Sequence, residues 1–354
     1  MSEETKVIKQ SVNKVQSVGT LQELNFTVEN SEVELTNGKT KKKVTCQTIK
    51  KADFKNPNLT VEVKPVDDDG NVRYTSTIGV NFYPTHDKKL DENGAIVDNP
   101  RFKALQTIME YKPKETRVKI DGTLNANEYG TSKDGGKTFE FASFPQINAF
   151  QVTSNGVPDD DMAEGELTGI IRSIKDETRT KNDEQEETGR KIVEFYSFDR
   201  NGKTTPQNLI VEKDLADDFE DIYETGQSCK LYYEIIARQV GGQKRKTKAA
   251  FGSRESKIVD GFNVTEYSIF RGDEPFEEEN EYYIDMDAMK QAMKERDNYK
   301  DTIIADAKKR ATEKNSGTGT TKRGLGNRTS KVEESAISEE DSESECPFWS
   351  NLTY

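Results

Sequence analysis

The chain has 354 residues, of which 32% are hydrophobic and 33% charged, and its formal net charge is −13 at pH 7. This length exceeds one typical domain, yet the apolar content is too low for one large core, so we expect two small folded units with appended segments. No run approaches the ~18 apolar residues of a membrane span, and the polar N-terminus lacks the apolar stretch of a secretory signal, so we expect a cytoplasmic protein without a membrane partner.

The cysteines do not form a recognisable framework. Cys46, Cys229 and Cys346 are widely separated and odd in number, so neither a set of disulfides nor a zinc knuckle is indicated. A reducing cytosol fits this pattern.

The first half of the chain is rich in β-strand patterns. Residues 1–20 are polar and are expected to form an N-terminal arm. The alternation of apolar and polar residues, with turns such as Asn37-Gly38 between the runs, predicts a first domain over residues 21–156. Its expected strands are 24–29, 43–49, 59–65, 72–83, 116–129 and 137–152. A helix is expected at residues 100–111, because apolar residues recur on one face and Pro100 suits a helix start.

The second half repeats that order over residues 157–282. Strands are expected at 165–174, 191–198, 208–213, 229–240 and 261–270, and a short helix at 214–225 with Asp214 as its N-cap and Gly226 at its end. Three strands, a helix and two strands is the element order of the OB-fold, a five-stranded Greek-key barrel. We therefore expect a mainly β protein with two tandem OB-fold-like barrels. Another small β-barrel or sandwich with one helix stays open.

The C-terminal region has a different composition. Residues 283–314 are expected to form a helix, because no Gly or Pro occurs from Met286 to Lys314. Residues 315–354 are expected to be a flexible linker and an acidic tail. From Glu333 to Glu345 the tail has seven acids and no base, so it cannot bury enough apolar surface to fold. A solubilising end and a tethered ligand both fit this segment.

The sequence lacks the residues that most catalytic motifs require. His86 is the only histidine, so serine or cysteine hydrolase chemistry would depend on one loop residue. The Gly-rich stretch 131–138 lacks the strand and helix of a phosphate-binding loop, and the acidic runs 159–161 and 277–287 do not converge as metal ligands must. We therefore expect no enzyme, no cofactor and no metal site. A metal-dependent nuclease that uses the acidic runs is a minor alternative.

Single-strand nucleic-acid binding has more support, because several strands combine cations and rings on the face that points away from the core. Such binding needs Lys and Arg for phosphates and exposed rings on which bases stack. In the strand 229–240, Cys229, Leu231, Tyr233, Ile235 and Ala237 form the expected inward face. Two basic loops, 37–44 and 241–257, add charge. For any single ring, ordinary sheet packing is the competing interpretation. The candidate DNA-binding residues are Lys41, Lys42, Lys43, Arg73, Tyr83, Arg117, Lys119, Tyr129, Lys230, Tyr232, Arg238, Lys244, Arg245, Lys246, Lys248 and Phe251.

Taken together, the chain resembles the single-stranded DNA-binding proteins of bacteria and bacteriophages, and the phage replication type most. The motif that carries the resemblance is the tail, where Asp341, Glu343 and Glu345 precede Pro347 and Phe348. The resemblance implies sequence-independent binding and protection of single-stranded DNA in replication, with roles in recombination and repair. It also implies a tail that competes with DNA and recruits replication or recombination proteins.

The end of the tail departs from the family pattern. In that family the chain ends at the Phe, whose carboxylate takes part in docking, whereas here residues 349–354 follow Phe348. We expect Pro347, Phe348 and Trp349 to form the partner-docking tip. The alternative function is a non-enzymatic β-barrel protein that binds other proteins or is associated with a virion.

Overall fold

The computed structural model describes residues 9–132, 134, 138–181, 184–199, 202–240, 244–245, 257–258 and 262–315. The chain divides into two compact units, residues 1–310 and 311–354. Everything described below belongs to the first unit, apart from the end of the last helix. No helix in the described part of the chain is long and apolar enough to cross a membrane.

Five strands of the first half pair in a closed circuit, which we call the first circuit. Its neighbours are antiparallel except for β5 and β10, which pair in parallel. In the order in which they pair, the strands are β1 (Asn13–Leu24), β4 (Leu59–Val63), β5 (Ser76–Asn81), β10 (Glu140–Thr153) and β9 (Arg117–Thr131), and β9 pairs again with β1.

Along the chain, one helix and five further strands are inserted between the strands of this circuit and lie outside it. Helix α1 (Pro100–Met109) lies between β5 and β9 in the chain, and the Asn99 side chain accepts a hydrogen bond from the backbone of Arg101 at its start. The helix buries Phe102, Leu105 and Ile108 in the core. The outer strands are β2 (Phe26–Thr36), β3 (Lys41–Lys51), β6 (Thr85–His86), β7 (Lys88–Leu90) and β8 (Ile96–Asp98).

Five strands of the second half pair in the same pattern, which we call the second circuit. The single parallel pair is again between the third and fifth strands, β13 and β17. In pairing order the strands are β11 (Met162–Lys181), β12 (Glu184–Phe198), β13 (Thr204–Val211), β17 (Phe262–Gly272) and β14 (Ser228–Val240), and β14 pairs again with β11. The other elements are the 3-10 turn η1 (Lys213–Leu215), α2 (Ala216–Ile222), β15 (Lys244–Arg245) and β16 (Lys257–Ile258).

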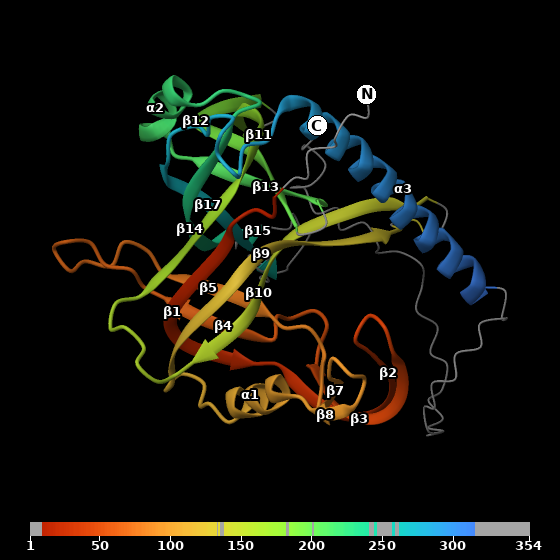
Figure 1. The fold of residues 1–354 in the computed structure, drawn as a ribbon. Coiled ribbons are helices and arrows are strands. Elements are labelled where there is room, and N and C mark those ends of the chain that lie inside the picture. Colours follow the sequence, from red (N-terminus) through yellow and green to blue (C-terminus); the bar gives the residue numbers. More distant parts are fainter. Residues whose placement is uncertain are drawn as a thin grey trace, which may run out of the picture. The chain divides into compact units, whose positions relative to one another are not determined.

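The two circuits are joined through their first strands. β1 and β11 run antiparallel and side by side, from Asn13 opposite Leu167 to Val18 opposite Met162 (Figure 1). Buried residues of both circuits belong to one continuous hydrophobic cluster. The sheet hydrogen bonds and the core therefore make the two halves one body.

Irregularities recur at matching places in the two circuits. The first strand of each has a β-bulge, at Gln22 in β1 and at Arg172 in β11. The fifth strand of each has a bulge too, at Phe150 in β10 and at Phe270 in β17. Bulges re-aim a strand at a defined point, so their recurrence shows that the two circuits bend in the same way.

Helix α3 (Met286–Asn315) packs Met289 and Ala292 against β11 and β12, and farther along it contacts the ribbon formed by β9 and β10. Arg296 is 5% exposed, and its Nη2 donates to Oε1 of Glu128 on β9 (2.5 Å) while its Nη1 donates to the carbonyl of Thr204 on β13 (3.2 Å). Farther along, a Cβ on Gly130 would lie 2.5 Å from Cβ of Ala307. The helix is thus tied to both circuits by a buried ion pair and by a glycine that lets it approach the strand closely.

The coarse expectations of fold are confirmed: the chain is mainly β, with a five-stranded barrel, outer strands and a C-terminal helix. The inward face expected for residues 229–240 is also confirmed, because Cys229, Leu231, Tyr233, Ile235 and Ala237 are all buried.

Three details are wrong. Residues 13–20, expected in the arm, belong to β1, and Val15 and Val18 in this stretch are buried. The polar residues around these two valines made the stretch resemble an exposed arm in the sequence. The strand expected at 24–29 is broken at Asn25, which separates β1 from β2. Asp214 is not the cap of α2, because η1 precedes the helix and Leu215 stands at the cap position without a side-chain hydrogen bond.

Two glycines of the first strands are expected to be essential for stability. A Cβ at Gly19 would lie 2.2 Å from the carbonyl oxygen of Glu62, and one at Gly169 would lie 2.1 Å from that of Tyr196. Because the obstacle is backbone, Gly19→Ala and Gly169→Ala should each lower the free energy of unfolding by about 1–3 kcal/mol. Urea unfolding measures this. The matched control is Thr77→Ala at an exposed strand position, and equal loss in all three variants would contradict the prediction.

Candidate functional site

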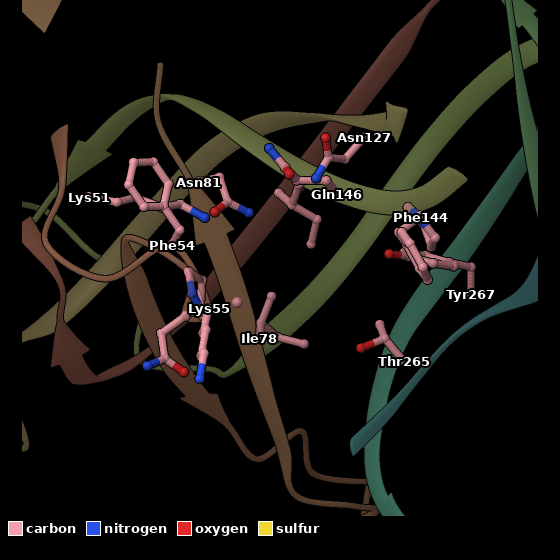
Figure 2. Close-up of a pocket in the computed structure, with 15 residues that line it drawn as sticks. Lys51, Phe54, Lys55, Ile78, Asn81, Asn127, Phe144, Gln146, Thr265 and Tyr267 are labelled. Carbon is pink, nitrogen blue, oxygen red and sulfur yellow. The ribbon is translucent and has the colours of Figure 1, made fainter. Parts of the chain in front are cut away.

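A cleft of about 300 Å³ lies on the first circuit, next to β17 of the second. Figure 2 shows Phe54 with Lys51 and Asn81 at one end, Phe144 with Tyr267 at the other, and Asn127 and Gln146 between them. Its walls come from the turn after β3, from β5, β9 and β10, and from Thr265 and Tyr267 on β17. A volume of this size is at the lower end of the range for small-molecule and cofactor sites.

One end of the cleft is formed by Phe54, whose side chain is 82% exposed. The turn that carries it is held by Asn25, the residue that breaks the first strand. Nδ2 of Asn25 donates to the carbonyls of Asp53 (2.8 Å), Asn56 (3.2 Å) and Pro57 (3.1 Å), and its Oδ1 accepts from the backbone of Asp53 (2.9 Å). These bonds order the turn, so that Phe54 projects from a fixed backbone rather than from a free loop.

The other end is an exposed ring pair, Phe144 on β10 and Tyr129 on β9. The rings stack with centroids 5.9 Å apart and planes at 29°, and they are 38% and 44% exposed. The opposite face of the same ribbon carries Glu128 and Gly130, which α3 covers. The helix therefore supports the ribbon from behind while both rings stay accessible in front.

Two lysines supply positive charge at the cleft. Neither Lys51 nor Lys55 forms an ion pair with any residue in the described part of the chain. Lys51 is half-buried, and burial lowers its pKa below the ordinary lysine value, with the Asp53 carboxylate partly offsetting that effect. Because burial disfavours the ammonium form of Lys51, an anion placed next to this lysine would stabilise that charged form.

Amide side chains cover the strand surface between the two ends. We call this set the amide face. Gln146 donates through Nε2 to Oδ1 of Asn148 (2.5 Å), and Asn148 donates through Nδ2 to the hydroxyl of Tyr83 (3.2 Å). The outward positions from Thr77 to Asn81 on β5, from Thr123 to Tyr129 on β9 and from Ala142 to Asn148 on β10 include no Lys, Arg, Asp or Glu. The amide face consists of Asn81, Asn125, Asn127, Gln146 and Asn148.

Two of the arginines expected to bind DNA are engaged inside the fold. Arg73 forms a bidentate ion pair with Glu234 (2.6 and 3.0 Å), which links the loop before β5 to β14. Arg117 bonds to Asp161 and to the carbonyls of Pro158 and Asp159 (2.5–2.7 Å). Acids distant in the sequence meet these side chains only after folding, and the DNA-binding role expected for both arginines stays a prediction.

The expected cations of the outer strand faces are also largely paired. Lys230 contacts Glu166 (2.5 Å) and Lys119 lies 3.8 Å from Asp121. The ring of Tyr232 has two cations next to it, Lys230 and Arg271, each 4.8 Å from its centroid. Ile236, expected to point outward beside them, is buried.

The remaining described candidates are divided. Tyr129 belongs to the ring pair at the cleft, and Tyr83 is exposed and adjoins the amide face through Asn148. Lys41 pairs with Glu34 (2.9 Å) in the β2–β3 hairpin, where Lys42 and Lys43 are exposed.

Several candidates cannot be placed. Arg238 lies on β14 opposite Val264, and Lys244 and Arg245 lie on β15, but their side chains are outside the described residues. The candidates wholly outside the described residues are Lys246, Lys248, Phe251, Pro347, Phe348 and Trp349.

The sequence contained signals for the residues that were missed. Phe54 is a lone aromatic in the turn-forming stretch KADFKNPN, where a buried role would be unusual. Strand alternation places Phe144, Gln146 and Asn148 on one face of a run that was correctly expected to be a strand. What alternation does not show is that Phe54 and these residues border the same cleft.

Comparisons with known proteins give a family and a distant structural likeness. A family model described as YorF matches residues 11–314. No curated protein matches the sequence. The solved structures that match include the wild-type single-stranded DNA-binding protein from Thermus aquaticus, with 13% identity, a TM-score of 0.39, and coverage of 77% of this chain and 96% of that one. A deletion variant of the same protein has the same identity and TM-score and is covered over 98% of its length. Likeness at this level does not carry an argument, so function has to be judged from the chain's own residues.

The Arg73 ion pair leads to a pH-dependent prediction. Burial, and next the charge of Glu234, raise the pKa of Glu164 above 4.5, while Arg73 opposes this rise. An acid with a raised pKa costs no stability below its ordinary pKa, and the cost grows as pH rises from that value to the folded-state pKa, above which it is complete. Arg73→Met should therefore destabilise the protein by about 1 kcal/mol at neutral pH, and by less near pH 4.5.

Urea unfolding at the two pH values measures this difference. The control is Arg271→Met, which removes an ion pair with Asp273 at 3.5 Å whose arginine is 65% exposed. The assignment of Arg73 as the group that offsets the charge of Glu164 would be contradicted if the difference in the free energy of unfolding between Arg73→Met and the wild type shrank with rising pH.

Proposed function

The chain belongs to the YorF family, and for this member we propose binding of single-stranded DNA, without catalysis, in the cleft between Phe54 and Phe144. The observation that carries the proposal is the pair of exposed aromatic ends on one cleft, with unpaired lysines beside it. Exposed rings along a groove with cations are what single-strand binding requires, because bases stack on rings and phosphates pair with cations.

The rings fit a stacking role better than a packing role. Phe54 is 82% exposed on a turn whose backbone is held by Asn25, so exposing the ring is a fixed feature of the fold. Phe144 is backed by Tyr129, and α3 holds the strands behind them. Rigid rings lose little conformational entropy when a base stacks on them.

The distribution of charge supports the same function despite a net charge of −13. Many acids near the circuits are neutralised by lysines and arginines of the fold, as the pairs of Arg73, Arg117 and Lys230 show. Lys51 and Lys55 stay available beside the cleft. We propose that they contact the phosphate backbone and make affinity fall with salt.

We further propose that both circuits are OB-fold modules, spanning about residues 13–153 and 162–272. Their common pairing order and matching bulges support this. OB-folds bind ligands beside the connection of strands one and two and that of strands four and five. Phe54 lies in the former connection of the first circuit, and Lys244 and Arg245 lie in the latter connection of the second.

A role in phage DNA replication, with partner recruitment through the C-terminal tail, belongs to the same proposal. Its support is the acidity of residues 333–345 followed by the apolar tip. The tail would occupy the cationic site in the absence of DNA and leave it when phosphates compete.

The first test removes the rings. Phe54→Ala and Phe144→Ala should each weaken binding of a mixed-sequence single-stranded oligonucleotide by about 1–3 kcal/mol, or roughly 5- to 150-fold. Fluorescence anisotropy across a salt series measures the affinity. The control is Phe150→Ala, an exposed ring of the same strand that does not line the cleft. Absence of binding by the intact chain at low salt would refute the function.

The second test removes residues 333–354. If the acids compete with DNA, the truncated chain should bind the oligonucleotide severalfold more tightly at low salt, and the difference should fade as salt screens the acids. The control keeps the tail and replaces its seven acids with serine or asparagine. If this control binds the oligonucleotide only as tightly as the unmodified full-length chain does, the acids do not compete with DNA.

A further inference from the structure

The amide face has a directional hydrogen-bond pattern. Gln146 and Asn148 each donate an N–H along the face, and Nδ2 of Asn125 donates to the hydroxyl of Thr123 (2.7 Å). An amide has two donors and an oxygen that accepts up to two hydrogen bonds. Three of the five amides therefore already use an N–H group within the protein.

The oxygens of the same face are largely unused. In the described part of the chain, no donor bonds to Oε1 of Gln146 or to Oδ1 of Asn125. Asn81 lines the cleft and is only 9% exposed, and its Oδ1 is buried without any partner. A buried acceptor without a donor costs about 1–3 kcal/mol, so this face is short of hydrogen-bond donors.

The position of these acceptors shows which part of a nucleotide they would meet. On β10, Gln146 is two residues from Phe144 on the same face, and Asn127 is directly opposite Phe144 on β9. A base stacked on the Phe144 ring presents its edge, not its phosphate, to neighbours in the strand surface. Uncharged oxygens also repel phosphate, so this face suits base edges.

We propose that the amide face makes the site selective for bases with an amino group at C4 of a pyrimidine or C6 of a purine, cytosine and adenine, over thymine and uracil. This inference rests on the proposed single-strand binding and replaces the sequence-independent binding expected from the sequence. Cytosine N4 and adenine N6 are donors, whereas O4 of thymine or uracil is an acceptor. Opposite Oε1 of Gln146, an amino group forms a hydrogen bond, while a carbonyl places two acceptors face to face.

The test compares oligo-dC with oligo-dU of about 16 nucleotides, the upper site size of one OB-fold. The two pyrimidines differ only in the group at position 4 and the protonation of N3, so stacking area and backbone charge are matched. Measured by anisotropy above neutral pH, the full chain should bind oligo-dC at least about 5-fold more tightly, as one good base contact predicts.

Two variants connect a preference to the face. Gln146→Met keeps the side-chain length but removes the acceptor, and it should bring the two affinities together. Gln146→Glu keeps acceptor oxygens, so it should retain the preference while its charge weakens both complexes. The matched control is Gln151→Met, an exposed position on β10 beyond the bulge, which should behave like the wild type.

The outcomes separate the inference from the function on which it rests. Equal affinity of the intact chain for the two oligomers would refute base selection and leave single-strand binding standing. A preference that survives in Gln146→Met would refute the role of the amide face. Absence of binding to either oligomer at low salt would refute the proposed function, and the inference with it.

Discussion

The antiparallel ladder between β1 and β11 is the contact on which the rest of the structure depends. β1 pairs with β11 and then β4 along one edge and with β9 along the other, and β11 in the same manner pairs with β1 and β12 along one edge and with β14 along the other. Neither strand keeps a long free edge, so each circuit completes the other's first strand. Because pairing is fixed residue by residue, the ladder also sets the position of one circuit relative to the other.

The cleft is a consequence of that register. Its rings Phe54 and Phe144 belong to the first circuit, whereas Thr265 and Tyr267 belong to the second. Two polar contacts reinforce the arrangement, since the backbone N–H of Ala237 donates to the hydroxyl of Ser76 (3.0 Å) and Arg73 pairs with Glu234. A site built across both circuits needs them held rigidly, which a flexible linker between separate domains would not do.

Electrostatics divides the cations of this protein into two groups. Arg73, Arg117 and Arg296 hold the fold together, each through acids that lie far away in the chain. The Arg296–Glu128 pair is almost fully buried, and the hydrogen bond from Arg296 to the carbonyl of Thr204 partly offsets the desolvation cost of the charges. Lys51 and Lys55, by contrast, form no ion pair within the described part of the chain. A negative net charge is thus compatible with an anion site, because pairing occurs locally.

Alternation and helical periodicity depend on near neighbours, so the strand patterns, both short helices, the last helix and the inward face of β14 could be predicted from the residues alone. The same patterns indicated outward rings such as Tyr129. Three features required the folded chain: residues 13–20 form a strand that pairs with both circuits, Arg73 and Arg117 are ion-paired, and Phe54 and Phe144 border one cleft. These outcomes depend on contacts between residues tens to hundreds of positions apart, and the strand register that makes them is set by the packing of the whole core.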